Sequence, residues 1–340
     1  MRMFIALFFL ASTFAVHAGV GLRALKVAEP ITGKTVPVEV FYPSSNAADD
    51  AAFEAGPYRI AAERGAAPDA GRHPLVLISH GHGGSRWGHH DLAEFLASHG
   101  YVVAAVEHPG DSFADQSGVG TDVALRGRAY QASAAISALL ADPMFASVID
   151  PARIGVAGFS AGGYTSLLLL GARPDFGRLI GYCRRHPRDA EICAGGAVPA
   201  EKIIAGISVL KNPPPMADAR IRAGFAMAPL GIFFGPGSLD AVKAPVFLYE
   251  AANDATLLPD ENARNVRKRL GTTYAFRSVR KADHYVFLAP CGSALAEAEP
   301  QLCRDPQGVD RVAVHAQLQR DALAFFDDAL KPAGAEGAKP

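Results

Sequence analysis

The feature that most constrains the fold is a repeated alternation of short, mostly apolar runs with segments of helical periodicity. The runs 74–79, 101–106 and 153–158 contain few polar residues. Strands buried on both faces of a sheet have this composition, whereas strands exposed on one face alternate apolar and polar residues. Because helical segments separate the runs, we expect an α/β fold with a mostly parallel central sheet and helices on both faces.

The other expected elements continue this alternation. Strands are expected at 22–27, 36–42, 74–79, 101–106, 153–158, 221–228, 245–250 and 273–279. Helices are expected at 91–99, 130–140, 161–170, 260–270 and 311–330. Asp260 and Glu261 would lie in the first turn of the fourth helix, where acidic side chains are favoured. The stretch 44–72 shows no clear period and predicts a loop with room for one helical turn.

Two regions depart from the alternation. The segment of about 172–218 holds two cysteines and a run of three prolines, and we expect a lid-like insertion over the edge of the sheet. Residues 331–340 are mainly Ala, Gly, Pro, Glu and Lys. Such a composition buries too little apolar surface to offset the entropy of ordering, so a disordered tail is expected. The folded domain is therefore predicted to span 19–330.

The apolar run 153–158 ends in a pattern typical of a nucleophilic serine. Gly158-Phe159-Ser160-Ala161-Gly162 fits G-x-S-x-G and lies between an expected strand and an expected helix. A serine on such a sharp turn needs a strained backbone, for which the glycines leave space. The N-terminus of the following helix faces the negative charge that develops during the reaction. We therefore predict that Ser160 is a nucleophile; the alternative is a glycine-rich turn that only connects strand to helix.

A serine hydroxyl is a weak nucleophile, and it needs a base and an orienting acid. In chains with this turn, the order is serine, acid, histidine. Asp254 follows the expected strand 245–250, and His284 follows the expected strand 273–279. Both positions lie at carboxyl ends of strands, where ligands bind in sheets of this kind. We expect Ser160, Asp254 and His284 to form a triad.

Other candidates for base and acid fit the order less well. Eight of the eleven histidines precede Ser160. His186 falls in the insertion, and His315 falls in the last helix, where a half-exposed surface histidine is the ordinary interpretation. For the acid, Glu250 is the alternative to Asp254.

A serine hydrolase also needs backbone N–H groups that bind the developing oxyanion. One should belong to Ala161, directly after the nucleophile, and the second to the loop after the strand at 74–79. That loop reads His80-Gly81-His82-Gly83-Gly84, and its glycines allow the main chain to approach a substrate closely. The N–H of His82 is the predicted second donor.

The same region contains several potential metal ligands: His80, His82, His89, His90 and Asp91. Catalytic zinc needs three convergent protein ligands. Nothing in the sequence fixes a third ligand, so we predict no metal site.

Large apolar residues near these motifs have two interpretations. Trp87, Tyr164 and the cluster 232–234 could line a pocket for the acyl or alcohol part of a substrate. Residues of this type are more often part of the core. Both interpretations remain open for Trp87 and Tyr164.

The N-terminus and the cysteines predict export. Residues 1–18 combine Arg2, a short apolar stretch and small residues before Gly19, which is typical of a cleaved secretory signal peptide; an uncleaved anchor is the alternative. No later segment is long and apolar enough to cross a bilayer. Four cysteines allow three pairings, and closeness in sequence favours Cys183–Cys193 and Cys291–Cys303. A periplasmic or secreted location is therefore expected.

The charge balance excludes some classes of partner. The chain has 33 basic and 34 acidic residues among 340. A net charge of -1 provides no broad positive field for nucleic acid. The composition leaves the oligomeric state open.

With these motifs identified, the chain resembles the bacterial dienelactone-hydrolase-like group of α/β-hydrolases. It is more distantly similar to secreted platelet-activating-factor acetylhydrolases. The similar stretches are 74–84, 96–108, 158–163 and 282–285. The resemblance implies the α/β-hydrolase fold, ester hydrolysis without a cofactor, and oxyanion donors at His82 and Ala161.

The chain departs from both groups. Dienelactone hydrolases proper use a cysteine nucleophile, where this chain has Ser160, so dienelactone is not the implied substrate. The acetylhydrolases carry their acid after an earlier strand, where this chain has Met227-Ala228-Pro229. Asp254 is thus supported by the bacterial pattern alone.

Together these features predict an exported serine carboxylesterase that acts on a small-molecule or lipid-like ester. An acyltransferase or amidase would use the same triad, and an inactive hydrolase fold could serve as a binding protein. Acyl length and leaving group are not encoded in any motif.

Overall fold

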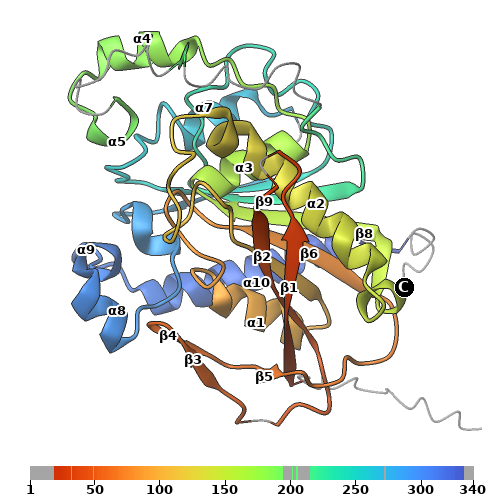
Figure 1. Ribbon diagram of the computed structural model, residues 1–340. Coiled ribbons are helices and arrows are strands. Elements are labelled where there is room, and N and C mark those ends of the chain that lie inside the picture. Colours follow the sequence, from red (N-terminus) through yellow and green to blue (C-terminus); the bar gives the residue numbers. More distant parts are fainter. Residues whose placement is uncertain are drawn as a thin grey trace, which may run out of the picture.

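The fold is built on a nine-stranded sheet in the computed structural model, which describes residues 19–31, 33–48, 50–193, 201, 204–205, 215–271 and 273–332 (Figure 1). The strand order is β11-β10-β9-β8-β6-β7-β2-β1-β5. Six neighbouring strands of this order are parallel to one another: β11, β10, β9, β8, β6 and β7. Strand β2 is antiparallel to both β7 and β1. The strands are β1 (Val20–Ala28), β2 (Thr35–Pro43), β5 (Glu63–Arg64), β6 (His73–Ser79), β7 (Val102–Val106), β8 (Ile149–Phe159), β9 (Ile221–Met227), β10 (Val246–Ala251) and β11 (Thr273–Val279).

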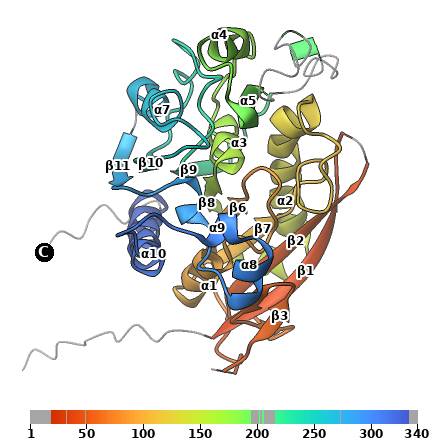
Figure 2. The ribbon, with the colours of Figure 1, turned by 90° about the vertical axis from the view of Figure 1, so that its left-hand side faces the viewer.

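Helices cover both faces of this sheet, as the apolar runs predict. On one face lie α1 (His90–Ser98) and α10 (Arg311–Ala329), and on the other lie α2 (Arg128–Ala141) and α3 (Ala161–Leu169) (Figures 1 and 2). Successive residues of β6 point to opposite faces. Leu75 and Leu77 join the core that contains α2 and α3, while Val76 and Ile78 join the core that contains α1 and α10. A short π-helix, η1 (Val123–Gly127), leads directly into α2, and the 3-10 turn η2 (Phe145–Ser147) follows it.

The chain reverses its direction of sheet growth at β6. It passes from β6 through α1 to β7 on one side, and then through α2 to β8 on the other side. Open α/β sheets bind ligands at such a switch point, in the crevice outside the carboxyl ends of the strands. The loops that follow β6 and β8 therefore lie next to each other.

The prediction for 44–72 was wrong in part. This stretch contains the hairpin β3 (Phe53–Ala55) and β4 (Tyr58–Ile60), with Gly56 at φ +61° in its turn. It also contains β5, which pairs with β1. Strands of two or three residues are too short to show an alternating pattern, and they form because a partner strand is present.

The prediction for the helix at 260–270 was wrong at its start. Helix α7 spans Ala263–Arg269, so Asp260 and Glu261 precede it. Asn262 explains the later start: it is buried, its backbone is not helical, and its side chain accepts a hydrogen bond from the N–H of Gly231 at 2.8 Å.

The described part of the insertion packs on loops that follow β9 and β10. It contains α4 (Arg178–Arg185) and α5 (Ala190–Cys193), joined by the Cys183–Cys193 disulfide. Arg178 donates to the carbonyl of Ile232 at 3.0 Å, and Arg185 pairs with Glu261. The insertion is thus anchored at the carboxyl edge of the sheet.

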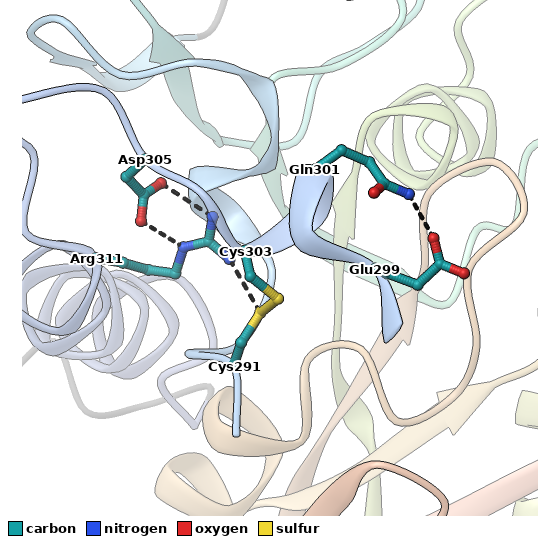
Figure 3. Close-up of a disulfide and its surroundings, with 6 residues drawn as sticks. All are labelled: Cys291, Glu299, Gln301, Cys303, Asp305 and Arg311. Carbon is teal, nitrogen blue, oxygen red and sulfur yellow. Dashed lines mark hydrogen bonds and ion pairs between the residues drawn. A yellow bond between two sulfur atoms is a disulfide. The ribbon is translucent and has the colours of Figure 1, made fainter. Parts of the chain in front are cut away.

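A second disulfide lies in the segment between β11 and α10. This segment contains the 3-10 turn η4 (His284–Phe287), α8 (Ser293–Ala298) and α9 (Pro300–Cys303). Cys291 pairs with Cys303, and the guanidinium of Arg311 lies between this disulfide and Asp305 (Figure 3). Both disulfides have the local pairing that closeness in sequence favours.

The predicted signal peptide, 1–18, lies outside the described residues, as does the predicted tail except for Lys331 and Pro332. Of the helices that the structure does describe, none has both the length and the hydropathy that crossing a bilayer requires.

Candidate active site

Ser160 lies on a strained turn between β8 and α3. Its backbone has φ +56° and ψ −117°, a conformation that non-glycine residues rarely adopt. The turn is tight: a Cβ added to Gly158 would lie 2.2 Å from the carbonyl oxygen of Gly162. The glycines around Ser160 therefore meet the steric need that the G-x-S-x-G pattern implies.

The start of α3 also packs against the end of β6. A Cβ added to Gly162 would lie 1.8 Å from the carbonyl oxygen of Ser79. This close approach, which only glycine allows, brings the loop after β6 to the side of Ser160.

His284 joins Ser160 and Asp254 through its two ring nitrogens. Its Nε2 lies 3.0 Å from Ser160 Oγ, and its Nδ1 lies 2.7 Å from Asp254 Oδ2. All three residues are buried, and Ser160 is the most exposed at 8%. The ring of Phe159 lies 4.7 Å from the His284 ring, centroid to centroid. The structure thus brings together three residues that are up to 124 positions apart in the chain.

Backbone hydrogen bonds fix the carboxylate of Asp254. Its Oδ1 accepts from the N–H groups of Thr256 at 3.0 Å and Leu257 at 2.6 Å, which leaves Oδ2 for His284. Asp283 Oδ1 accepts from the N–H of His284 at 2.7 Å and from the N–H of Ala255 at 2.9 Å. Asp283 therefore ties the loop that carries the acid to the loop that carries the histidine.

The alternative acid and the other late histidines make different contacts. Glu250 accepts hydrogen bonds from Arg264 at 3.0 Å and from Ser278 at 2.6 Å. His186, in the insertion, contacts Glu261 of the loop after β10. His315 is not a half-exposed surface residue as predicted: it is buried, and its Nδ1 lies 2.6 Å from Asp91 Oδ2. It is buried because α10 packs against α1, a contact that the local sequence does not encode.

The loop after β6 reaches the nucleophile. A Cβ added to Gly81 would lie 3.4 Å from Ser160 Cβ, so the main chain beside His82 passes close to the serine. Ala161 is the first residue of α3, where N–H groups have no acceptor within the helix. The two segments predicted to supply oxyanion donors are thus neighbours in space.

A buried hydrogen-bond network supports this loop, and sequence reasoning missed it. His80 Nδ1 donates to the carbonyl of Gly81 at 2.6 Å, and its Nε2 accepts from the N–H of His108 at 3.1 Å. His108 Nδ1 donates to Gln131 at 2.8 Å, and its Nε2 accepts from Ser79 Oγ at 2.8 Å. Burial and, to a smaller extent, the nearby Arg128 lower the pKa of His80 to about 3, so His80 is neutral.

Two charged residues of this network, Asp111 and Arg128, gave no signal in the sequence. Each lies in a segment of mixed composition, and a buried arginine on a helix looks like an exposed one until its neighbours are known. Arg128 is 1% exposed, and its Nη1 lies 2.6 Å from Asp111 Oδ2.

The residues considered as metal ligands are dispersed over separate contacts. His82 Nδ1 lies 2.5 Å from Asp111, His90 contacts Glu94, and Asp91 contacts His315. Within the described ranges, no group of three or more His, Cys, Asp or Glu side chains is arranged to hold a metal ion.

Trp87 and Tyr164 lie in the core rather than in an open pocket. Trp87 contacts Phe41 and Phe53 edge to face. Tyr164 is 1% exposed and stacks on Phe234. Their positions match the core interpretation and give no support for contact with a substrate.

A groove elsewhere on the molecule does not include the triad. It lies between the ends of β10 and β11 and the start of α10, and its lining includes Tyr249, Arg277, Arg280 and Gln317. Ser160, Asp254 and His284 are not part of its lining.

Comparison with known proteins agrees with this architecture. Residues 52–124 match the family model described as platelet-activating factor acetylhydrolase, isoform II. No curated protein sequence matches the chain significantly.

Two solved structures are similar over nearly their whole length. A ferulic acid esterase from Streptomyces cinnamoneus has a TM-score of 0.62 at 21% identity, and the match covers 97% of this chain and 96% of that one. A dienelactone hydrolase from Anabaena variabilis has a TM-score of 0.50 at 15% identity, and the match covers 92% of this chain and 100% of that one. The two structures confirm the α/β-hydrolase fold. Together with the family-model match, they confirm the resemblance to dienelactone hydrolases and platelet-activating-factor acetylhydrolases.

Proposed function

We propose, from an α/β-hydrolase fold that carries a hydrogen-bonded serine, histidine and aspartate at its switch point, that this protein hydrolyses carboxylic esters. The single observation that carries the proposal is the contact of His284 with Ser160 Oγ at 3.0 Å and with Asp254 at 2.7 Å. This is the arrangement that makes a serine hydroxyl nucleophilic. The match to an acetylhydrolase family model and the likeness to an esterase support the same reaction class.

The reaction begins with proton transfer. His284 Nε2 takes the proton from Ser160 Oγ as the oxygen attacks the ester carbonyl carbon. Asp254 holds the imidazole in the tautomer whose Nε2 can accept, and it stabilises the imidazolium that forms. The carbonyl oxygen becomes an oxyanion, which the N–H groups of Ala161 and His82 bind.

Collapse of the tetrahedral intermediate then releases the alcohol. The bond between the carbonyl carbon and the alcohol oxygen breaks, and the imidazolium gives its proton to the leaving oxygen. Water enters, loses a proton to His284 and attacks the acyl carbon. The second intermediate expels Ser160 Oγ, which regains its proton, and the carboxylic acid leaves.

Export is part of the proposal. The first 18 residues have the composition of a signal peptide. Disulfides Cys183–Cys193 and Cys291–Cys303 suit the oxidising periplasm or extracellular space, because cytosolic thiols are kept reduced.

The test is covalent labelling combined with turnover. A fluorophosphonate probe should modify Ser160 in the folded protein, and Ser160→Ala should lower p-nitrophenyl acetate turnover by about 10⁴-fold or more without unfolding. Ser166→Ala is the matched control, because Ser166 lies on the same helix with its hydroxyl bonded to the carbonyl of Gly162. A Ser160→Ala variant that keeps its turnover, or a folded wild type without labelling, would refute the proposal.

A further inference from the structure

A buried ion pair lies behind the loop that carries His82. Asp111 belongs to the loop after β7, and Arg128 is the first residue of α2. Their side chains are 3% and 1% exposed, and Arg128 Nη1 lies 2.6 Å from Asp111 Oδ2. Replacing such a pair by apolar residues often leaves a protein equally stable, so stability alone does not explain two charges in this place.

The guanidinium of Arg128 contacts both segments predicted to supply oxyanion donors. Its Nη2 donates to the carbonyl of His80 and, at 3.3 Å, to Ser79 Oγ. Its Nε donates at 3.2 Å to Thr165 Oγ1, which itself donates at 2.9 Å to the carbonyl of Ala161. One rigid, planar group therefore connects the start of the loop after β6 with the first residue of α3.

The carboxylate of Asp111 holds the other side of the same loop. Its Oδ1 accepts from the N–H of Gly83 at 3.2 Å and lies 2.5 Å from Nδ1 of His82. Arg128 thus anchors the peptide before Gly81, while Asp111 anchors the ring of His82 and the peptide after it.

We infer that Asp111 and Arg128 form a positioning pair, which fixes the N–H groups of His82 and Ala161 relative to each other and to Ser160. The inference rests on the proposed function and deepens it. Donors of this kind act only when they lie close to the position that the oxyanion will occupy. Because the two charges neutralise each other, the pair acts through geometry rather than through net charge.

The ionisation of both groups agrees with this role. Burial lowers the pKa of Arg128, and Asp111 offsets part of that effect. Burial raises the pKa of Asp111, but Arg128 and the hydrogen bond from His82 outweigh it and leave that pKa below its ordinary value. Asp111 is therefore ionised at neutral pH, and the Arg128 guanidinium beside it stays protonated, as arginine does in proteins.

Arg128→Lys gives the sharpest test. Lysine keeps a positive charge for Asp111 but loses the planar fork that reaches His80 and Thr165 together. We expect kcat/KM for p-nitrophenyl acetate to fall about ten- to hundredfold, chiefly through kcat. The inhibition constant of phenylboronic acid, which forms a tetrahedral adduct on the serine oxygen, should rise by a similar factor.

A matched control separates positioning from general loss of structure. Arg220 pairs with Asp218 before β9, at the amino ends of the strands and away from Ser160. Arg220→Lys should change neither kcat nor the phenylboronic acid constant. If Arg220→Lys lowers kcat and raises the phenylboronic acid constant as Arg128→Lys does, the positioning role is refuted.

A double variant addresses the case in which single changes fail to fold. Asp111→Leu/Arg128→Met removes both charges and leaves neither unpaired. It should therefore be more resistant to urea than Asp111→Leu alone or Arg128→Met alone. Its kcat/KM and boronic acid affinity should stay low, because the contacts to His80 and Gly83 are gone. Recovery of activity together with stability would show a purely structural role and overturn the inference.

The outcomes also distinguish this inference from the proposed function. A wild type without turnover that depends on Ser160 would refute both. An active wild type, combined with unchanged kcat and boronic acid affinity in Arg128→Lys and in the double variant, would refute the positioning role alone.

Discussion

His315 on α10 donates a hydrogen bond from Nε2 to the backbone carbonyl of Val286, at 2.9 Å, two residues beyond His284. Its other ring nitrogen lies 2.6 Å from Asp91 on α1. The turn that carries His284 is therefore held by a buried histidine, which pairs with a half-buried carboxylate and so joins two helices on one face of the sheet. This contact has a direct consequence for stability.

Replacing His315 should destabilise the fold. His315→Ala removes both hydrogen bonds and leaves the half-buried carboxylate of Asp91 without its histidine partner. We expect the free energy of unfolding to fall by about 2–4 kcal/mol, measured by urea denaturation at pH 7. His186→Ala is the control, because its pair with Glu261 is more exposed and should contribute less than about 1 kcal/mol. A loss of similar size in both variants would contradict this account.

The acid can be identified by comparing two carboxylates at the end of β10. Asp254→Asn keeps the hydrogen bonds from Thr256 and Leu257 but no longer holds the required imidazole tautomer. We expect kcat to fall by about 10³- to 10⁴-fold with little change in KM. Glu250→Gln weakens the contact with Arg264 and should leave kcat within a fewfold of wild type. Steady-state kinetics that show the reverse ranking would assign the acid to Glu250.

The close approach of α3 to β6 predicts an intolerant glycine. Gly162→Ala would place a methyl group 1.8 Å from the carbonyl oxygen of Ser79, and both main chains belong to the centre of the fold. We expect a loss of about 3 kcal/mol or more in unfolding free energy, or no soluble folded protein. Gly271→Ala is the control, since a Cβ there has no neighbour within 4 Å. Its stability should change by less than about 1 kcal/mol. Equal thermal melting of the two variants would contradict the packing argument.

Buried histidines predict loss of stability in mild acid. Burial lowers the pKa of His80 to about 3 and of His89 to about 4, and it also lowers the pKa of His108. Unfolded histidine titrates near pH 6.5, so below this pH the unfolded chain binds protons that the folded chain excludes. The stabilising contribution of these histidines to the unfolding free energy is therefore fully present above about pH 6.5. Below this pH the unfolding free energy falls by about 1.4 kcal/mol per pH unit for each such histidine.

One substitution tests this sign and size. His89→Leu removes one of the histidines that exclude a proton in the folded state. Between pH 6 and pH 5 the slope of its unfolding free energy against pH should therefore be smaller than that of the wild type, the difference being about 1.4 kcal/mol per pH unit. Near pH 8 the unfolding free energies of the wild type and His89→Leu should depend on pH in the same way. Urea titrations with identical slopes in the acid range would show that His89 does not contribute.

The sequence was sufficient for the elements whose signal is local. The buried strands β6, β7 and β8 are visible as apolar runs, because a strand covered on both faces has no polar side. The strained turn at Ser160 is visible because its glycines have a steric reason to be there. Order along the chain then excluded eight of the eleven histidines, and position after the last strand favoured His284 among the other three.

Other features depended on distant partners and left no local signal. Strands β3 to β5 form by pairing with partner strands. Helix α7 begins late because the side chain of Asn262 accepts a hydrogen bond from the N–H of Gly231. His315, Asp111 and Arg128 are polar or charged residues of the kind usually found on the surface, yet all three are buried. Burial of a charged side chain is favourable only when an opposite charge or a hydrogen-bond partner meets it, and those partners come from other parts of the chain.

The sequence by itself thus determined an α/β sheet and a set of candidate chemical groups in a fixed order. Only the tertiary structure decided that β6 lies between β7 and β8, which places the main chain of Gly81 against Ser160. It also decided which carboxylate faces His284 and which ion pair supports the loop of His82. The physical reason is that hydrophobic periodicity is set within a few residues, whereas hydrogen-bond geometry is set by segments that meet only after the chain has folded.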